Sequence, residues 1–442
     1  MRAMRDSGIP WIGEMPANWD LRRMKTCLKS RVSGAWGDEP KGDDGDIVCL
    51  RIADYDYDRF AFKNTPIDDL TVRNYDLDTI QKLLLRKGDI LIEKSGGGEK
   101  TPVGRSVVFD KDYPALYANF MDCLRCASAV TSKWMQYVFV TFYKNDYTRN
   151  YIKQTTGIQN LDLTSMLASE SVPVPSVDEQ EKITGFLDAE CARIDAVMEQ
   201  TRASIEEYKK LKQSIITEAV TKGIRPNRPM KNSGNKWIGS IPVDWETNKI
   251  KHISSGVGDG LHAAPEFDDE GQYFFINGNN LGEKQIRIKD NTNSVSEEEY
   301  SKYSQPALCS NAVLIALNGT YGLVSFYNGE RVMLGKSAGY VNLYPTIQRN
   351  YVRYSLLSDC SKKQMDDSLA GTTIANVSLK TIKNIAIAWP SEKEQEEIAL
   401  RLDNMCNEIE KLLAEKVKLL SELESYKKSL IFEYVTGKKE VV

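Results

Sequence analysis

Long apolar runs are missing from this 442-residue chain, which contains no stretch of about 18 consecutive apolar residues. That absence excludes a membrane-spanning helix of ordinary length. The N-terminal MRAMRDSGIPW carries basic residues with no apolar segment behind them, so we expect no secretory signal. With 41% apolar and 27% charged residues, the composition is that of a globular protein, which we expect in the cytoplasm.

The usual signatures of catalysis are also missing. The chain has only two histidines, His252 and His262, and neither offers a general base. It has no Walker motif, no glycine fingerprint for a methyl donor, and no tetrapeptide of the Asn-Pro-Pro or Asp-Pro-Pro type used by amino-methyltransferases. The acidic runs DDGD and EFDDE are more typical of solvated loops than of a metal site. We therefore predict a chain that is not an enzyme and holds no cofactor or metal.

Cysteine is present but is not arranged as a disulfide scaffold. The eight cysteines are scattered, which favours reduced thiols. Cys123 and Cys126 form one CxxC pair, but a zinc site needs four ligands, and both histidines lie in the other half of the chain. We expect these two thiols to pack within the strand FMDCLRCASAV.

What the chain does contain is a repeat. SGIPWIGEMPANWD at Ser7 returns as SGNKWIGSIPVDWE at Ser233, with the same spacing of Trp, Gly and Pro. Later in each half, PSVDEQEKI at Pro175 returns as PSEKEQEEI at Pro390. The two halves therefore share one order of motifs.

Each half closes with a predicted long helix. Ser176 and Ser391 start capping boxes with Glu179 and Glu394, in which the serine accepts from the backbone and the glutamate reaches back to the cap amide. Gly223 and Gly437 are typical helix stops. Each helix holds about 45 residues and spans roughly 65 Å, which suits a spacer.

A heptad pattern runs along both helices, and we predict that they pair as an antiparallel coiled coil. The positions of the predicted seam in the first helix are Ile183, Leu187, Ile194, Val197, Tyr208, Leu211 and Ile215. Those in the second helix are Ile398, Leu402, Met405, Ile409, Leu412, Lys416, Leu419, Leu423, Tyr426 and Leu430.

The segments between the repeated motifs predict two mixed α/β domains, so the fold class is α+β with an internal tandem repeat. GDILIEK and NAVLIAL read as buried strands, and KWMQYVFVTFYKNDY and NYVRYSLLSDCSKKQM as helices. TTGIQNLDL and GTTIANVSL, which align through Ile158 with Ile374 and Asn160 with Asn376, close the two domains. The predicted parts are a first mixed domain, a first helix, a second mixed domain and a second helix, at 1–175, 176–223, 224–390 and 391–442.

In these motifs the chain resembles the specificity subunit of type I restriction and modification systems. The likeness covers essentially the whole chain and rests on SGxxWIGxxPxxW at Trp11 and Trp237, on GDILIEKSGGGEKTPVGR, and on the PSxxEQxxI helix starts. It implies that each divergent domain reads one half of a split, asymmetric DNA target, and that the helices separate the two readers. A chain with two similar starts would then match a target with two parts.

The resemblance also implies the partners. These are double-stranded DNA and two modification subunits that use S-adenosylmethionine to methylate adenine. A restriction subunit with ATP and Mg can join them. An alternative from another class is a coiled-coil scaffold whose globular heads bind other proteins. No membrane partner is expected.

The charge of the chain is compatible with DNA binding but does not by itself indicate it. The net charge is −4, whereas phosphate contact usually leaves a basic signature. The two predicted helices carry most of the excess acidity, so each recognition domain needs only a local basic face.

The glycine-rich loop in the first domain is the leading candidate for such a face. Lys94, Lys100 and Arg105 flank glycines whose backbone amides can approach a phosphate or a base edge closely. A P-loop needs Gly directly before Lys, where this chain has Glu99. A plain turn between strands stays open as the alternative. The candidate DNA contacts here are Lys94, Ser95, Gly96, Gly97, Lys100, Thr101 and Arg105.

The second domain offers a less basic counterpart in NGTYGLVSF, and amide side chains close both domains. Asn and Gln can form two hydrogen bonds to adenine, yet they are also common turn and cap residues. The further candidates are Gln159, Asn160, Asn318, Thr320, Tyr321, Lys336 and Asn376.

Overall fold

The computed structural model describes residues 2–155, 157–303, 306–369 and 376–441. Ile374, used above to align the two closing segments, lies outside the described residues. The chain forms two compact units, Met1–Arg202 with Val417–Val442, and Ala203–Lys416. Each unit thus holds one mixed α/β domain together with part of each long helix, whereas the four predicted parts separated domains from helices.

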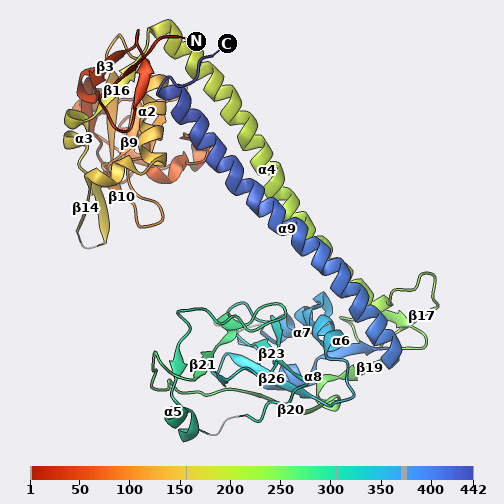
Figure 1. Ribbon diagram of the computed structural model, residues 1–442. Helices are drawn as coiled ribbons and strands as arrows, with labels where there is room; N and C mark the ends of the chain where they lie inside the picture. The colour runs from red at the N-terminus through yellow and green to blue at the C-terminus, as the bar shows by residue number, and fades with distance from the viewer. Residues whose placement is uncertain (1, 156, 304–305, 370–375, 442) are drawn as a thin grey trace. The chain divides into compact units, whose positions relative to one another are not determined.

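Unit 1 is built on a four-stranded antiparallel sheet of order β11-β9-β13-β4 and a three-stranded sheet of order β12-β5-β8; Figure 1 labels β9 of the larger sheet. The strands of these two sheets are β4 (Leu28–Ser33), β5 (Asp46–Leu50), β8 (Val72–Asn74), β9 (Ile90–Glu93), β11 (Ser106–Val108), β12 (Ala115–Tyr117) and β13 (Met121–Cys126). A third sheet, of order β10-β15-β14, joins β10 (Ser95–Gly96), β15 (Ile158–Leu161) and β14 (Ile152–Thr155).

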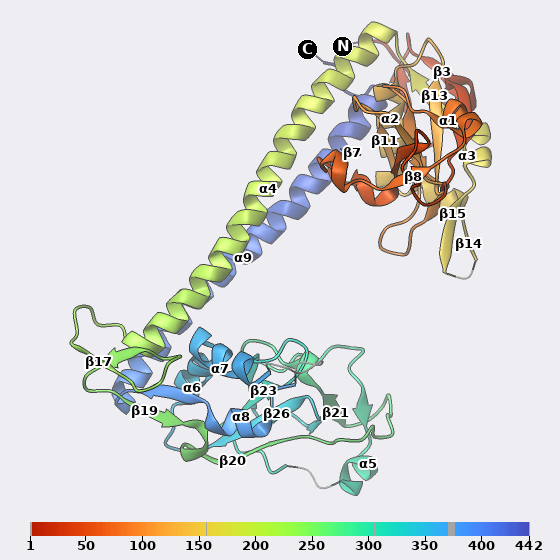
Figure 2. The ribbon, with the colours of Figure 1, turned by 180° about the vertical axis from the view of Figure 1, so that it is seen from behind.

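The helices of this domain are α1 (Leu77–Leu83), α2 (Ser132–Lys144) and α3 (Leu163–Ser169). Short pairs complete it: β1 (Met4–Asp6) with β2 (Glu14–Pro16), β3 (Asp20–Arg23) with β16 (Ser171–Val174), and β6 (Tyr55–Asp56) with β7 (Ala61–Phe62). In Figure 2, α2 lies against β11, and the hairpin of β14 and β15 extends from the body of the domain. Apolar side chains of α2 and the sheet share one core with the two long helices, α4 (Val177–Lys222) and α9 (Glu392–Val435).

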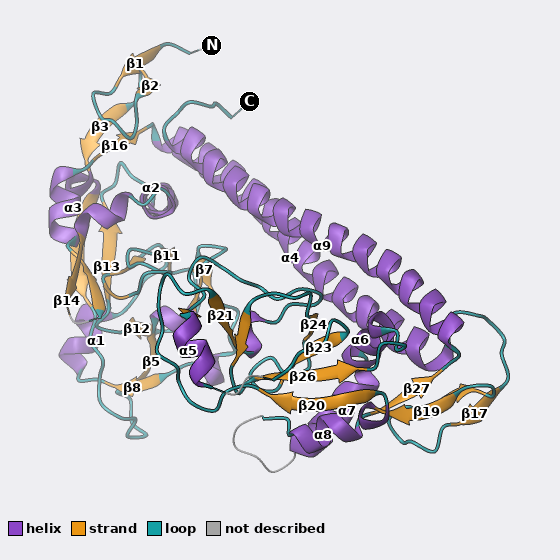
Figure 3. Cartoon of the chain, turned by 60° about the horizontal axis from the view of Figure 1, so that its bottom comes forward, coloured by secondary structure: helices purple, strands orange, loops and turns teal. Residues whose placement is uncertain are grey.

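Unit 2 repeats this plan. Its four-stranded antiparallel sheet has the order β20-β26-β23-β24, and its three-stranded sheet the order β22-β21-β25 (Figure 3). The strands are β20 (Ser254–Asp259), β21 (Tyr273–Ile276), β22 (Ser294–Val295), β23 (Ala312–Ala316), β24 (Val324–Phe326), β25 (Val332–Leu334) and β26 (Ala338–Leu343). The parallel pair β5–β12 of unit 1 reappears as β21–β25. The predicted tandem repeat of two mixed domains is therefore confirmed.

The helices of unit 2 are α5 (Glu297–Lys302), α6 (Arg349–Leu357), α7 (Asp359–Leu369) and α8 (Leu379–Asn384). The predicted helix NYVRYSLLSDCSKKQM is split at Ser358 into α6 and α7. The short pairs are β17 (Met230–Asn232) with β18 (Ser240–Pro242), and β19 (Glu246–Lys249) with β27 (Ala386–Trp389).

The two long helices pack against each other in both units. In unit 1 the ring of Phe186 lies 4.7 Å from that of Tyr434. Further along in the same unit, Asp195 pairs with Lys427. Residue numbers rise in one helix as they fall in the other, so the packing is antiparallel there.

The heptad prediction holds for only part of the seam. Leu402, Ile409 and Leu430 are buried, as predicted. Leu412 and Leu419 are each 40% exposed, and other seam positions of both helices are more exposed still: Val197, Leu211 and Tyr426. A pair of helices buries one stripe of each, and these positions of the predicted seam lie outside the buried stripe.

The repeated opening motif docks onto the start of a long helix in each unit. Trp19 is 1% exposed and donates its indole hydrogen to Glu179 Oε2 at 2.9 Å. Trp245 is buried and makes the same bond to Glu394, also at 2.9 Å. Ser176 Oγ does accept from the Glu179 amide at 3.3 Å, as predicted. The glutamate half of the predicted capping boxes is wrong, because each glutamate side chain binds a tryptophan of the opening motif instead.

The predicted helix ends at glycine and the predicted packing of Cys123 and Cys126 in a strand are both found in the structure. Gly223 (φ +80°) and Gly437 (φ +74°) adopt the left-handed conformation just beyond the two helices. Cys123 and Cys126 lie in β13, and burial raises the pKa of each thiol to about 12. Within the described residues, no helix is long and apolar enough to cross a membrane, and no cluster of three potential metal ligands occurs.

Candidate nucleic-acid interface

Three segments of the first domain meet where β9 ends. The backbone amide of Lys94 donates to Phe120 O at 2.9 Å, in the turn between β12 and β13. Leu161 of β15 donates its amide to Lys94 O at 2.7 Å. Directly beside this junction, Ser95 of β10 pairs with Asn160 of β15. The glycine-rich loop and the closing amide segment, far apart in sequence, are thus brought together.

The second domain builds the same junction. Leu317, directly after β23, donates its amide to Ser337 O at 3.0 Å, in the turn between β25 and β26. Val377 donates to Leu317 O at 2.7 Å, and Asn318 forms a β-bridge with Asn376. This junction joins Asn318 and Asn376 beside the turn that carries the exposed Lys336.

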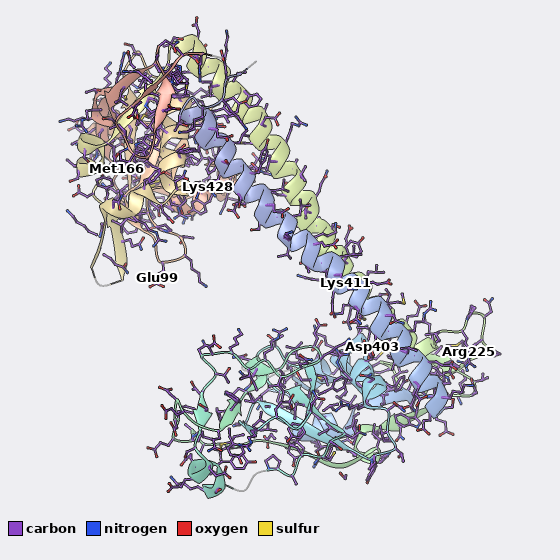
Figure 4. The ribbon with its side chains drawn as sticks, viewed as in Figure 1. Glu99, Met166, Arg225, Asp403, Lys411 and Lys428 are labelled. Carbon is purple, nitrogen blue, oxygen red and sulfur yellow. The ribbon has the colours of Figure 1, made fainter. Side chains whose placement is uncertain are left out.

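The glycines of the first domain have structural reasons for being there. A Cβ on Gly97 would lie 2.7 Å from Val103 N and 2.8 Å from Thr101 O, so no side chain fits. Gly96 has φ +124°. Gly98 and Thr101 exchange two backbone hydrogen bonds and close a tight loop. Glu99 lies at the outer end of this loop (Figure 4), and Lys100 beside it is exposed, as is Thr101.

Arg105 is engaged inside the domain. Its guanidinium donates to both carboxylate oxygens of Glu93 at 2.7 Å and lies 3.6 Å from the ring centroid of Tyr57. The side chain of Glu93 is 1% exposed and that of Arg105 is 10% exposed. Burial raises the pKa of Glu93, against the lowering effect of its hydrogen bonds from Arg105. This geometry gives Arg105 a structural role and argues against the predicted phosphate contact.

Lys94 belongs to a charge network that the sequence did not reveal. Its Nζ lies 2.7 Å from Asp122 Oδ1 and 2.8 Å from Ser33 Oγ. Asp122 is fully buried and also accepts from Arg31 Nε at 2.5 Å. Two cations therefore surround one carboxylate beside the junction, which leaves a net positive charge. The signal that could have found Arg31 and Ser33 is the two-residue alternation of β4, which places both on its exposed face.

The closing amides of the first domain differ in accessibility. Gln159 is buried, and its Oε1 accepts from Val103 N at 3.4 Å, so this side chain braces the loop rather than facing outward. Asn160 is exposed, and its Oδ1 accepts from Ser95 Oγ at 2.7 Å. Of the two candidate amides of the first domain, only Asn160 is exposed.

Two further asparagines join the second junction. Asn277 and Asn279 follow β21 within FFINGNN. Gly278 donates its amide to Ser337 Oγ at 2.9 Å, and Ser337 Oγ donates to Asn277 Oδ1 at 3.2 Å. A Cβ on Gly319 would lie 3.8 Å from Asn279 Oδ1. We call Asn277, Asn279, Asn318 and Asn376 the asparagine cluster.

Of the two remaining candidate DNA contacts of the second domain, one is exposed and the other is bonded within the domain. Thr320 is exposed at the end of the turn that begins at Asn318. Tyr321 donates its hydroxyl hydrogen to Asp366 Oδ1 of α7 at 2.6 Å, and this hydrogen bond raises the pKa of the phenol. Tyr321 therefore ties the turn to a helix, while Thr320 stays accessible.

Residues 39–207 and 242–419 match the family model described as the type I restriction modification DNA specificity domain. The chain belongs to this family. The two matched regions fall in the two halves of the internal repeat. Each specificity domain match covers most of one mixed α/β domain and extends into a long helix.

Three relatives with similar sequences are named as type I restriction enzyme specificity subunits. The type I restriction enzyme MjaVIII specificity subunit of Methanocaldococcus jannaschii is 25% identical over 310 residues, 68% of this chain and 70% of that protein. The putative MjaX specificity subunit of the same organism is 22% identical over 97% of this chain and 96% of that protein. The EcoDI specificity subunit of Escherichia coli is 25% identical over 45% of this chain and 39% of its own length.

Solved structures share the fold. A chain from a study of complex assembly and conformational transition of the type I R-M system superposes with a TM-score of 0.69 at 14% identity, covering 96% of this chain and 99% of that one. The HsdS subunit of Thermoanaerobacter tengcongensis gives a TM-score of 0.51 at 14% identity, covering 96% and 98%.

The two specificity domains present different chemistry on the same frame. The first junction is cationic, through Lys94 and Arg31, with Lys100 on the adjoining loop. The second is dominated by the neutral amides of the asparagine cluster, with Lys336 alongside. Lysine and arginine suit phosphates and guanine, whereas asparagine suits adenine. One scaffold is thus supplied with two sets of side chains.

Proposed function

We propose that this chain is the DNA-recognition subunit of a type I restriction and modification complex, and that its target is bipartite and asymmetric. One specificity domain reads each half of the target, and α4 with α9, paired as an antiparallel coiled coil, sets the distance between the halves. The observation that carries this proposal is the junction built twice from the same three segments with different side chains. A repeated frame with divergent contacts is what two unlike half-sites require.

The chain itself supplies recognition, and its partners supply the chemistry. We propose that two modification subunits bind S-adenosylmethionine and methylate adenine where this chain places them. A restriction subunit that uses ATP and Mg joins the same complex, which acts in the cytoplasm.

The exposed apolar stripe of the helices supports a docking site for the modification subunits. Leu412, Leu419 and Tyr426 recur every seven residues on α9 and are 40%, 40% and 52% exposed. Val197 and Leu211 of α4 are similarly exposed, at 45% and 47%. Exposed apolar side chains that recur along a helix are typical of protein interaction sites, and such a stripe fits a helix of the partner.

Methylome sequencing tests the proposal. Cells that express this chain with its modification subunits should carry methylated adenines within one split motif whose halves differ. Cells that express the modification subunits without this chain are the control and should lack that motif. A continuous motif, or the same motif in the control, would refute the proposed function. A protein-binding scaffold would leave the methylome unchanged.

A further inference from the structure

A buried lysine joins the recognition domain of unit 1 to both long helices. Lys427 of α9 is 6% exposed, and its Nζ lies 2.7 and 2.8 Å from the two carboxylate oxygens of Asp195 on α4. The same ammonium donates to Asp58 O at 2.6 Å, in the loop after β6. It also lies 4.8 Å from the ring centroid of Phe60. One side chain of α9 therefore contacts two other parts of the unit, α4 and the loop after β6.

The loop that Lys427 holds is fastened from other directions as well. Arg59 donates to Glu199 of α4 at 2.6 Å, and Arg202 of α4 lies 3.4 Å from Asp58 Oδ2. Gln136 of α2 donates to Phe60 O at 2.5 Å.

Phe60 itself has φ +53°, a conformation that is costly for a bulky L-residue. Such strain persists only where the surroundings over-determine the backbone, and it concentrates at functional sites. The contacts of this loop with α2, α4 and α9 supply that constraint.

Unit 2 contains a corresponding lysine, which bonds the other long helix and a loop of the domain. Lys212 of α4 bonds the Glu283 carboxylate and lies 2.8 Å from Glu410 Oε1 on α9. Lys212 and Lys427 are 215 residues apart, as are their helix partners Asp195 and Glu410, which matches the offset of the two helix starts. The lysine thus lies on α4 in one unit and on α9 in the other.

The loop of unit 2 is also held by several elements. Arg353 of α6 donates to Glu283 O, and Lys284 lies 3.0 Å from Asp403 Oδ1 of α9, which Figure 4 labels. Burial lowers the pKa of Lys212, but its hydrogen bonds to Glu283 and Glu410 outweigh that effect and raise it. The ammonium therefore stays charged at neutral pH.

In each unit the loop that is bonded by the lysine leads directly to the junction of its own domain. In unit 1 the segment 52–60 runs from Ile52, which lies 3.7 Å from a Cβ position on Gly96, to the loop at Asp58. In unit 2 the segment 277–284 runs from Asn277 of the asparagine cluster to Glu283. In each unit the loop held by the lysine is therefore only a few residues along the chain from the junction.

We propose that Lys427 and Lys212 are positioning residues that fix the orientation of each recognition domain on its own part of the helix pair, and thereby restrict the complex to one gap length between half-sites. This inference rests on the proposed function. A change of one base pair moves a half-site by about 3.4 Å along the duplex and also rotates it. A domain held in one orientation rejects such a shift, whereas a loosened domain accepts it.

The test uses the complete chain assembled with its modification subunits. In Lys427→Met/Asp195→Leu both charges are replaced by apolar side chains, since removing one alone would leave a buried charge unpaired. Lys428→Met, on the exposed neighbour labelled in Figure 4, is the matched control. Methylation is read on a DNA library in which the gap is varied by one base pair in each direction.

The double variant should methylate the same two half-sites, while its preference for the native gap over the neighbouring gaps falls on the order of ten-fold, which corresponds to about 1.4 kcal/mol. Lys428→Met should keep the native preference. An unchanged preference in an active double variant would overturn the inference. A wild-type chain without a split motif would instead refute the proposed function.

A second variant guards against misfolding of the first. Arg59→Ala/Arg202→Ala removes only exposed ion pairs of the same loop, which contribute little to stability, so this variant should fold. It should broaden the gap preference in the same direction by a smaller factor. If the first variant does not fold and this variant keeps the native preference, the inference is wrong.

Discussion

Arg2 donates to Glu179 Oε1 at 2.6 Å and so joins the N-terminal segment to the first turn of α4. The same guanidinium donates to Gly437 O at 2.7 Å, just beyond the end of α9. In unit 2 Arg228 bonds Glu394 at the start of α9. Since Trp19 and Trp245 of the opening motif bind the same two glutamates, the motif is part of a structural joint at a helix start, which explains in physical terms why it occurs once in each half.

Trp19→Phe should destabilise the protein by about 1–3 kcal/mol, because it removes the indole donor from a half-buried carboxylate. Trp245→Phe should have a similar effect through Glu394. Denaturant unfolding of each variant measures the loss. Trp36→Phe, on an exposed tryptophan of the first domain, is the control and should change stability little. Equal stability of all three variants would show that these joints contribute nothing.

Arg105→Ala should mainly lower the stability of the folded protein rather than weaken DNA binding directly. Removing one partner of a buried ion pair costs about 3–5 kcal/mol, because Glu93 is left charged or must take up a proton. Arg105→Ala/Glu93→Leu should recover much of that loss. Thermal unfolding provides the measurement. If Arg105→Ala unfolds as wild type does but binds DNA more weakly, Arg105 contacts DNA after all.

Lys100→Ala should leave stability unchanged and weaken DNA binding for every sequence alike. If Lys100 neutralises one phosphate, the slope of log K against log salt should fall by roughly 0.9. Binding by the assembled modification complex at several salt concentrations gives this slope. Glu99→Ala, on the neighbouring loop residue, removes a negative charge instead and should not lower it. An unaltered slope in Lys100→Ala would indicate that Lys100 contacts no phosphate and that the loop has a purely structural role.

Asn376→Ala should relax recognition in the second half-site alone. If the amide makes two hydrogen bonds to an adenine, the variant should lose about 1–3 kcal/mol of discrimination at a single base pair. Asn160→Ala should produce the corresponding change in the first half-site. Methylome sequencing reports both. A variant that alters the two halves together would contradict independent reading by the two domains.

Leu419→Asp should weaken capture of the modification subunits without unfolding the chain, because this side chain is 40% exposed on α9. Glu422→Asp, an exposed acidic position on the same helix, is a mild control. Co-purification of the modification subunits with each variant gives the comparison. Full recovery of the complex with Leu419→Asp would place the docking site elsewhere.

Lengthening both helices by one heptad should widen the gap between half-sites. Seven residues added to α4 after Arg202 and seven to α9 before Val417 extend the pair by at most roughly 10 Å. That length corresponds to about three base pairs at 3.4 Å each. The half-sites should keep their bases, although rotation about the duplex should lower affinity. An active variant with the original gap would show that the helices do not set the separation.

Much of the fold could be read from the sequence because it depends on local pattern. The repeat, the two long helices with their glycine stops, and the buried strands GDILIEK and NAVLIAL all follow from spacing and periodicity. The match of Asn160 with Asn376 also indicated which segments close the domains, and both proved to lie at the junctions.

Tertiary structure decided which side chains are available. The sequence placed Arg105 among the candidate contacts, but only the fold brings Glu93 and Tyr57 to its guanidinium. A heptad pattern does not say which of its positions meet the partner helix. Burial divides the predicted seam of α9 accordingly, with Leu402 inside and Leu412 outside.

The asparagine cluster and the contacts of Lys427 and Lys212 could not be predicted from the sequence for the same reason. Asn277 is far in sequence from its partner Ser337, and Lys427 is far from Asp58, so neither pairing leaves a periodic signal. Local periodicity predicts helices and strands because each residue's neighbours along the chain determine its environment there. Side-chain partners across the fold depend on how the elements pack, which only the tertiary structure decides.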